Sequence, residues 1–566
     1  MSSDIGRIDK QTFLRFWRIA KPFFVSEMRW KALGLIVLLI TISASLSGLN
    51  VWRSYVDRDF MSALAQRNRE TFFYQLYLYL ALFSALTPVA VFYRFTEERL
   101  ALMWRNWLCR YMLNKYFTNR AYYRIDLEQS VDNPDQRLEE DIRSFAASSL
   151  SFALIFFNSA VALVAFIGIL WTISAILPVA ALIYAALGTV ATYLLGRPLI
   201  ALNFAQLKKE ANLRYKLVNV RDHAESIAFY GGEKEESKHV SERLKDAIDN
   251  MRAIICWNRN VGFFTHMYNY VHAIVPVVLV APLFLNGEIE FGVVTQAAGA
   301  FGQVLGALSV IVVHFGNLSS LAAVVNRLGT FDQAITTESH PSQTPKPQIT
   351  LRQADNLRFE EVTIMTPRGD EVLVKNLSLD LQTINSLLIC GPSGSGKSSV
   401  LRVLAGLWNS GSGLLERPAV KDMVFLPQRP YLILGSFRDQ LYYPGLETHI
   451  TEDELWEAIR QVGLEGTIAR VGGLDSQMDW SNVLSVGERQ LIAFVRLVLR
   501  KPEIVLLDEA TSALDRETAL KLYTLVQSFA KHYISVGLKV DLGKHHEWAL
   551  ELDGQGGWTL TRTKQS

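Results

Sequence analysis

The chain has 566 residues, half of them hydrophobic, and a formal net charge of only +2. This length exceeds what a single hydrophobic core usually supports, so we expect at least two domains. The near-neutral charge gives no reason to expect a nucleic acid partner. The three cysteines, Cys109, Cys256 and Cys390, lack metal-like spacing, and we expect them to stay reduced. The polar, basic N-terminal segment predicts no cleavable signal peptide.

Six stretches in the first part of the chain are long and apolar enough to cross a bilayer, whose hydrocarbon core takes about 20 helical residues. They are 31–51, 72–93, 148–172, 174–196, 261–285 and 291–315. The third and fourth are nearly continuous, and because their combined length is about twice what one span needs, we expect a tight turn near Ser174. The long segments that follow the second and fourth spans are helix-prone, so we expect helices that continue out of the membrane.

Basic residues predict the orientation. Lys10, Arg15, Arg18 and Lys21 precede the first span, and both long segments are rich in arginine and lysine. The connection after the fifth span, 286–290, has acids and no base. The positive-inside rule therefore places the N-terminus, both long segments and the C-terminal half in the cytoplasm. The arginines that follow the first span fit this rule less well.

Polar residues within the spans are candidates for contact with a transported substrate, because in lipid such groups must face protein or water. The candidates are His272, Gln296 and Gln303. Hydrogen bonding between helices, without a substrate, is the interpretation that we favour for any one of them.

Prolines and small polar residues over 336–350 break every periodic pattern and predict a linker. We therefore expect a transmembrane domain over 1–335 and a second domain over 351–566.

The segment Gly391–Ser398 fits the phosphate-binding pattern G-x-x-x-x-G-K-[ST], between an apolar strand, 387–390, and a helical pattern, 399–408. Glycines let backbone N–H groups face phosphate oxygens, Lys397 suits the β- and γ-phosphates, and Ser398 suits Mg²⁺. A chance Gly/Ser turn is the alternative, which the strand–loop–helix context disfavours. The predicted ATP-binding residues here are Gly391, Ser393, Gly394, Ser395, Gly396, Lys397, Ser398 and Ser399.

A second apolar strand, Ile504–Leu507, is followed by two acids. An acid at the carboxyl end of a buried strand beside a phosphate-binding loop is well placed to hold Mg²⁺, which fits Asp508. Glu509 could orient and deprotonate an attacking water. An ordinary strand that ends in solvated acids is the alternative.

Ser485 and Glu488 have the spacing of a capping box at the start of a helix, which is a sufficient structural explanation. The same helix N-terminus, with Ser485 and Gly487, could also serve as a second phosphate clamp. The motif alone leaves both interpretations open.

Together, the order of Gly391–Ser398, Leu426–Gln428, Leu484–Gln490 and Ile504–Asp515 resembles the nucleotide-binding domain of ABC transporters. By that resemblance, Gln428 ligates Mg²⁺ and senses the membrane domain. Ser485, Gly487 and Glu488 would contact ATP held by the opposite subunit. The implied fold is a membrane α-helical domain of the six-helix ABC exporter type fused to an α/β P-loop ABC ATPase domain.

Further segments are similar to subfamily D, the peroxisomal and lysosomal half-transporters and their bacterial relatives, and to the SbmA/BacA type of membrane domain. They are 435–440 and 552–558 for the former and 58–64, 133–136 and 296–304 for the latter. The resemblance implies a half-transporter that pairs with a second copy of itself or with a related chain and uses ATP and Mg²⁺. The expected setting is a bacterial inner membrane, and the expected substrate is bulky: a peptide, a cobalamin-like molecule or an acyl lipid.

One position departs from the family pattern. Where the last strand is normally followed by a switch histidine, this chain has Leu538. Loss of a polar group at comparable sites costs roughly 10²–10³ in rate, so slow hydrolysis is one expectation. Tolerated divergence, with Glu509 and Mg²⁺ carrying the chemistry, is the other. The alternative function is an ATP-binding membrane gate or regulatory subunit, or the degenerate half of a heterodimer.

Overall fold

The structure is a computed structural model that describes residues 10–128, 131–337, 347–367, 369–445, 450–538 and 542–563. The chain divides into two compact units, Met1–Glu338 and Ser339–Ser566.

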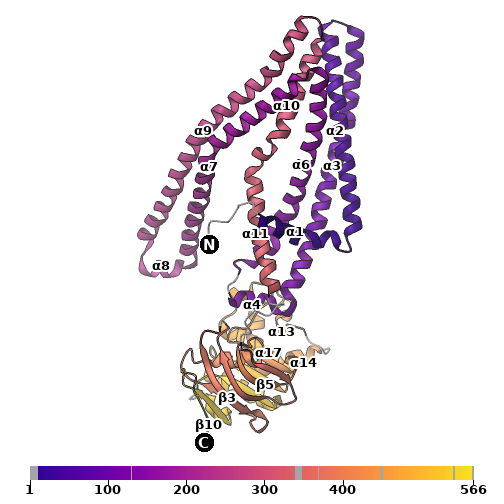
Figure 1. The fold of residues 1–566 in the computed structure, drawn as a ribbon. Coiled ribbons are helices and arrows are strands. Elements are labelled where there is room, and N and C mark those ends of the chain that lie inside the picture. The colour runs from indigo at the N-terminus through magenta and orange to yellow at the C-terminus, as the bar shows by residue number, and fades with distance from the viewer. Residues whose placement is uncertain are drawn as a thin grey trace. The chain divides into compact units, whose positions relative to one another are not determined.

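The first unit is all helical (Figure 1). Its helices are α1 (Lys10–Val25), α2 (Arg29–Ala65), α3 (Arg69–Phe117), α4 (Ala121–Glu128), α5 (Pro134–Gln136), α6 (Ile142–Ile173), α7 (Ile176–Asp222), α8 (Ala224–Tyr230), α9 (Glu233–Leu285), α10 (Phe291–Val313) and α11 (Phe315–Thr337). A 3₁₀ turn, Thr118–Arg120, precedes α4, and a π-helical turn, Arg137–Asp141, precedes α6. Among the described residues, 6 helices are long and apolar enough to cross a membrane, which confirms the six-helix prediction. The tight turn between the third and fourth spans is also confirmed, because α6 ends at Ile173 and α7 begins at Ile176.

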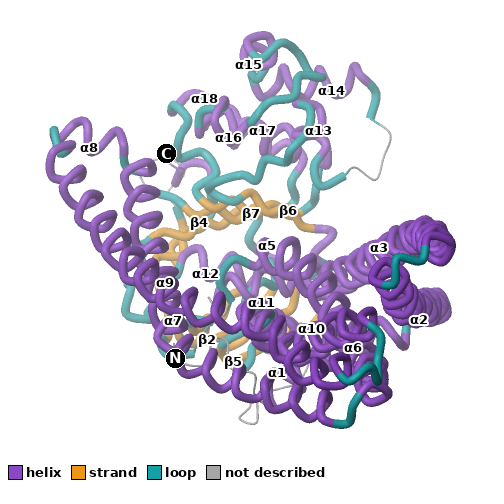
Figure 2. Tube along the Cα trace, turned by 90° about the horizontal axis from the view of Figure 1, so that it is seen from above, coloured by secondary structure: helices purple, strands orange, loops and turns teal. Residues whose placement is uncertain are grey.

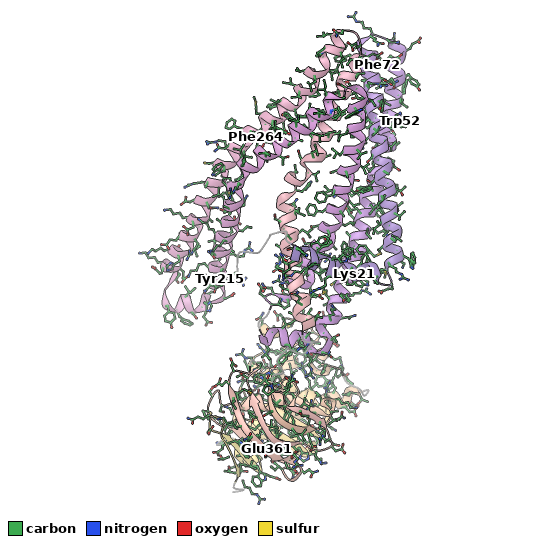
Figure 3. The ribbon with its side chains drawn as sticks, viewed as in Figure 1. Lys21, Trp52, Phe72, Tyr215, Phe264 and Glu361 are labelled. Carbon is green, nitrogen blue, oxygen red and sulfur yellow. The ribbon has the colours of Figure 1, made fainter. Side chains whose placement is uncertain are left out.

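Helices α7 and α9 extend far beyond any bilayer. They have 47 and 53 residues, which at 1.5 Å per residue makes them about 70 and 80 Å long against a hydrocarbon core of about 30 Å. They lie side by side and are joined by the short helix α8 (Figure 1). In Figure 3 the side chains of Tyr215 on α7 and Phe264 on α9 stand along this pair. The segment after the fourth span is therefore helical, as expected.

Helix α10 packs against α2, α6 and α9, and small residues make the approach to α2 close. A Cβ atom at Gly292 would lie 1.8 Å from the backbone oxygen of Arg58, so glycine is required there. Ala297 and Ala300 are fully buried on the same helix. Small residues at helix contacts are the usual way for membrane helices to gain van der Waals packing.

Buried ion pairs attach α11 to α3 and to the π-helical turn before α6. The Asp141 side chain is only 2% exposed and accepts from both Nε and Nη2 of Arg327, the first at 2.9 Å. Lys115 on α3 donates to Asp332 on α11 at 2.9 Å. Because a buried carboxylate is costly without its partner, these pairs specify where α11 packs.

The second unit contains two sheets and a group of helices. Its strands are β1 (Thr350–Gln353), β2 (Arg358–Met365), β3 (Val372–Asp380), β4 (Ser386–Cys390), β5 (Gly411–Arg417), β6 (Met423–Leu426), β7 (Ile504–Asp508), β8 (His532–Val536), β9 (Trp548–Leu552) and β10 (Trp558–Arg562). Its helices are α12 (Lys397–Leu404), α13 (Phe437–Tyr442), α14 (Glu452–Val462), α15 (Glu465–Arg470), α16 (Trp480–Val483), α17 (Val486–Arg500) and α18 (Arg516–Phe529). Three short 3₁₀ turns are Leu381–Thr383, Val420–Asp422 and Gly543–His545.

The six-stranded sheet has the order β10-β9-β4-β8-β7-β6, and the smaller sheet has the order β1-β5-β2-β3. In the larger sheet β9, β4, β8, β7 and β6 run parallel, and β10 is an antiparallel edge strand. Figure 2 shows β4, β7 and β6 in one row, with helices α13 to α18 on one face and α12 on the other. The predicted strands β4 and β7, both fully buried, and the helix expected over 491–499 are thus confirmed. The helix expected over 399–408 is shorter, because α12 ends at Leu404.

The parallel pairing brings several loops to one edge of this sheet. Ile389, Val536 and Asp508 pair across β4, β8 and β7. The loops after these strands therefore start at the same level, which is where ligands bind in open α/β sheets.

The expected linker, 336–350, falls mainly outside the described residues, which omit 338–346. On its flanks, α11 continues to Thr337 and β1 begins at Thr350. The exact domain limits at 335 and 351 stay predictions.

Candidate nucleotide-binding site

The loop between β4 and α12 has the backbone of an anion cradle. Gly391, Gly394 and Gly396 have φ angles of 144°, 81° and 93°, in the region that favours glycine. A Cβ atom at Gly391 would also lie 2.4 Å from the backbone oxygen of Leu552. Successive N–H groups of such a loop, followed by a helix N-terminus, form a binding site for phosphate oxygens.

The side chains of the loop differ in their exposure. The Lys397 ammonium donates to the backbone oxygens of Gly391, at 3.0 Å, and Pro392, at 2.8 Å, so it lies across the loop that it is predicted to serve. Ser393 is exposed, but Ser395 and Ser399 are only 3% and 6% exposed. Their hydroxyls do not face solvent, and the contact of these two residues with ATP stays a prediction.

Four side chains from three segments meet beside this loop. Ser398 Oγ donates to Asp508 Oδ1 at 2.8 Å. Gln428 Nε2 donates to Glu509 Oε2 at 2.7 Å. Glu509 has a φ of 47°, a conformation that a non-glycine residue adopts only when its surroundings impose it. Hydroxyl, carboxylate and amide oxygens are the ligands that Mg²⁺ prefers, so this donor set fits the metal.

Gln490 connects the segments that carry these residues, and the sequence analysis did not single it out. Its side chain is 1% exposed. Its Nε2 contacts the backbone oxygens of Gln428, at 3.3 Å, and Glu509, at 3.4 Å, as well as Ser512 Oγ at 3.3 Å, while Oε1 accepts from Ala513 N at 3.1 Å. A detectable signal existed: position 490 shares the apolar face of α17 with Ala493, Phe494 and Leu497. A polar residue on a buried helical face requires partners.

At the start of α17 the capping box predicted from the sequence is present. Ser485 Oγ accepts from Glu488 N at 3.2 Å, and Glu488 Oε2 accepts from Ser485 N at 2.9 Å. Glu488 Oε1 also accepts from Thr467 and Arg470. Partial burial opposes ionisation of Glu488, but these hydrogen bonds outweigh it and hold its pKa below the usual value. The carboxylate is thus used within the chain and positions the start of α17. Its contact with a nucleotide held by the opposite subunit stays a prediction.

Gly487 lies directly against the segment that follows Glu509. A Cβ atom there would lie 3.0 Å from Ala513 O and 3.3 Å from Leu514 Cδ2. Any side chain at 487 would push α17 away from that segment, which explains the glycine. Ser485 is exposed and keeps a free face for a further partner.

Leu538 lines a hollow of about 540 Å³ together with Lys397 and Glu509, and its side chain is 71% exposed. The switch position is thus next to the candidate catalytic residues and carries a side chain that cannot form hydrogen bonds. Leucine at this position offers Glu509 no hydrogen-bonding side chain.

Neither His546 nor His532 takes the place of the switch histidine that the family pattern has at position 538. His546 is 4% exposed; its Nδ1–H donates to Leu542 O at 2.9 Å, which leaves Nε2 to accept from Ser535 Oγ at 2.9 Å. Burial lowers the pKa of His546 to about 4. His532, expected before the last strand, instead begins β8, at the end opposite the site, and its Nδ1 contacts Ile384 O at 3.1 Å.

The three candidate substrate contacts in the membrane unit have different surroundings. Gln296 is 3% exposed and donates to Ser54 Oγ of α2 at 3.3 Å, so it bonds between helices. Gln303 is exposed in the single chain, and His272 is partly exposed. His272 Nε2 lies 3.7 Å from the place of a Cβ atom on Gly302, so it approaches α10 near Gln303. Gln296 is therefore engaged in a bond between helices, whereas His272 and Gln303 are close to each other and have no such bond among the described contacts.

A helical unit with six membrane-length helices, on one chain with a P-loop ATPase of this topology, defines an ABC transporter. Comparison with family models agrees: residues 19–285 match "ABC transporter transmembrane region 2" and residues 374–512 match "ABC transporter". The chain belongs to the ABC transporter family, and its ATPase activity is coupled to transport.

Named relatives narrow the assignment. An uncharacterized ABC transporter ATP-binding protein of Synechocystis is 41% identical, over 94% of this chain and 82% of that protein. The lysosomal cobalamin transporter ABCD4 of Homo sapiens is 30% identical, over 99% of this chain and 97% of that protein. The resemblance to subfamily D and its bacterial relatives is thus confirmed.

Among solved structures, a bacterial Atm1-family ABC exporter with ATP bound aligns with a TM-score of 0.70, over 94% of this chain and 96% of that chain. The sequence identity is 16%, so this likeness concerns the fold. It confirms the exporter-type arrangement of a transmembrane domain fused to an ABC ATPase.

We predict that Gln490→Ala lowers the steady-state ATPase rate by about tenfold with little change in ATP affinity, because positioning bonds worth about 1.4 kcal/mol are lost. The measurement is ATP turnover and nucleotide affinity of the full-length protein in lipid. Gln461→Ala, which removes an exposed glutamine bonded to Glu457 within α14, is the matched control. Equal rates for the Gln490 variant and the unmodified protein would contradict the positioning role.

We further predict an acid-sensitive stability from His546. Because its pKa falls from 6.5 in the unfolded chain to about 4 in the folded one, the unfolded state binds more protons between these values. Stability is complete above pH 6.5 and is lost as the pH falls toward 4, with about 2 kcal/mol gone at pH 5. Urea unfolding of the nucleotide-binding domain at pH 7 and pH 5 measures this loss, and His546→Gln should remove that part of the pH dependence. An equally steep loss in the variant would assign it to other groups.

Proposed function

We propose that the protein is a homodimeric ABC half-transporter that uses Mg²⁺ and ATP to move a bulky substrate across a membrane. The observation that carries the proposal is the meeting of Ser398, Asp508, Gln428 and Glu509 at one edge of a parallel sheet, on a chain with six membrane-length helices. Bound Mg²⁺ would supply positive charge against the β- and γ-phosphates.

In this proposal the chain's own residues divide the chemistry. The N–H groups of the 391–398 loop and the N-terminus of α12 hold the phosphates, and Lys397 adds its charge. Ser398, Asp508 and Gln428 offer oxygen ligands to the metal. Glu509 orients the attacking water and takes its proton. Because Gln428 holds the Glu509 carboxylate at 2.7 Å, movement of the segment that carries Gln428 would reorient the base.

Dimerisation is supported by the described lining of the hollow around Lys397, which does not include the helix N-terminus that the site is expected to need. Its lining, within the described part of the chain, includes no residue from the N-terminus of α17. Ser485 nevertheless presents an exposed hydroxyl and free helix N–H groups at that N-terminus, in a form suited to phosphate. A second copy would bring its own Ser485 and Gly487 to complete the site. The same argument holds for a related half-transporter as the partner.

The relatives support a proposed substrate class and a proposed location. The human relative is named a lysosomal cobalamin transporter, which supports a bulky substrate such as a cobalamin-like molecule; peptides and acyl lipids are the other candidates. The Synechocystis relative supports a bacterial inner membrane with the ATPase domain in the cytoplasm. His272 and Gln303 are the residues that we propose as substrate contacts, since Gln296 is bonded between helices.

The exposed Leu538 favours a second candidate function: a gate or regulatory subunit that closes on ATP and turns over slowly. A heterodimer is the related version, in which the partner supplies a complete switch for its own site only. The turnover rate separates these candidates from an active pump.

We predict that the unmodified protein in lipid hydrolyses ATP measurably faster than Glu509→Gln, because the base is present. Leu538→His should raise the rate by roughly tenfold or more, by adding a polar contact to the transition state. Steady-state turnover of the three proteins is the measurement. If the unmodified protein only matches Glu509→Gln while Leu538→His is active, the gate replaces the pump as the proposed function.

We also predict that Glu509→Gln with ATP accumulates a nucleotide-bound dimer, since hydrolysis would no longer reopen it. Light scattering or native mass spectrometry measures the mass of the purified protein with and without ATP. Ser485→Arg in the same background should prevent the ATP-dependent gain in mass, because it places a cation and a bulky side chain at the shared surface. A protein whose mass stays that of a monomer with ATP would contradict the composite site.

A further inference from the structure

A hollow of about 1010 Å³ lies between the start of α2 and the C-terminal half of α3, far along the chain from the nucleotide site. Its apolar lining includes Trp30, Leu35, Leu38, Leu102 and Met103. Trp30 is 71% exposed and also lines a neighbouring hollow of about 330 Å³ with Phe24, Leu33 and Ile36. The two apolar hollows thus share one aromatic wall.

The charge of the larger hollow has one sign. Lys31, Arg99 and Arg105 contribute to its lining, which contains no acid among the described residues. Arg105 has an exposed partner, Glu139, at 3.5 Å. Lys31 and Arg99 have no ion pair within the described ranges. Three cations beside an apolar wall match a ligand with an anionic group and hydrocarbon chains.

The position of the cations relative to the bilayer also matches such a ligand. The apolar stretch of α3 ends at Arg94, and Arg99 follows by five residues, about 7.5 Å along the helix. Lys31 precedes Leu33, where the apolar part of α2 begins. The polar layer of a bilayer extends roughly 5–8 Å beyond its hydrocarbon core, so both cations are at headgroup level. Helical side chains point toward the helix N-terminus, which directs Arg99 back toward the membrane.

Helix α1 gives an independent sign that this end of the unit contacts a membrane surface. Ile19 and Phe23 bury one face of α1, where Phe23 stacks on Trp104 of α3. On the other face Phe13, Leu14 and Trp17 are more than half exposed. Lys21 projects from α1 at the end of the unit away from Phe72 (Figure 3). An amphipathic helix with basic residues and exposed aromatic residues is typical of the bilayer interface.

We propose that the hollow between α2 and α3 binds an anionic phospholipid of the cytoplasmic leaflet. Lys31 and Arg99 hold the phosphate, Arg105 adds charge at its outer side, and the acyl chains lie on Leu35, Leu38 and Leu102. The site does not depend on the transport proposal, since none of these residues belongs to the nucleotide site or to the candidate substrate contacts.

The test uses native mass spectrometry of the full-length protein in detergent, with added dioleoyl phosphatidylglycerol or phosphatidylcholine. We expect at least tenfold tighter binding of phosphatidylglycerol. The double variant Lys31→Gln, Arg99→Gln should lower that affinity about 25-fold, because each cation near a lipid headgroup contributes about fivefold. It should lower phosphatidylcholine binding much less, because the choline cation offsets the phosphate charge in that headgroup.

The control is Lys21→Gln with Arg110→Gln, which removes two exposed cations from α1 and α3 outside the hollow. It should bind phosphatidylglycerol like the unmodified protein. Equal loss in both double variants would assign the effect to general surface charge and overturn the site. So would equal affinity of the unmodified protein for the two lipids. Displacement of phosphatidylglycerol by millimolar glycerol 3-phosphate would identify a soluble phosphate ligand instead and would also overturn the proposal.

Discussion

The parallel pairing of β4, β8 and β7 is the constraint on which the nucleotide site depends. Since Ile389, Val536 and Asp508 pair across these strands, the phosphate loop, the switch position and the acidic pair begin at one level. The bond between Ser398 and Asp508, at 2.8 Å, then joins the first of these segments to the last. A shift of one residue in this register would turn Asp508 to the other face of the sheet and separate it from Ser398.

The membrane unit depends on close helix packing and on buried charge. Gly292 lets α10 reach the backbone of α2, and Asp141 with Arg327 positions α11. Neither contact involves the residues proposed for transport or for lipid, so the scaffold and the sites are separate sets. The proposed lipid site is at the headgroup level of this scaffold, where apolar helices end and basic residues begin.

Sequence patterns predicted most of the ATPase half because its motifs combine local backbone chemistry with fixed spacing. The glycines of 391–396, the capping box at Ser485 and the acid after β7 each have a local physical cause. Gln490 and the internal role of Glu488 could not be found this way, because both depend on partners at distant positions, such as Ser512 and Arg470. In the membrane half, polarity identified Gln296 but could not tell that Ser54 would be its partner.

The sequence by itself determined the class of the protein through six apolar stretches of membrane length, a phosphate-binding loop and the order of the motifs that follow it, and it also placed a leucine at the switch position. Those features are local, since length, hydropathy and backbone freedom are properties of neighbouring residues. The tertiary structure alone decided which side chains are exposed and can contact a ligand or a neighbouring segment. It buried Ser395, Ser399 and Gln296, exposed Leu538 beside Glu509, enclosed His546, and grouped Lys31 with Arg99. The exposure of a side chain depends on packing between segments that are distant in the sequence, which no local pattern specifies.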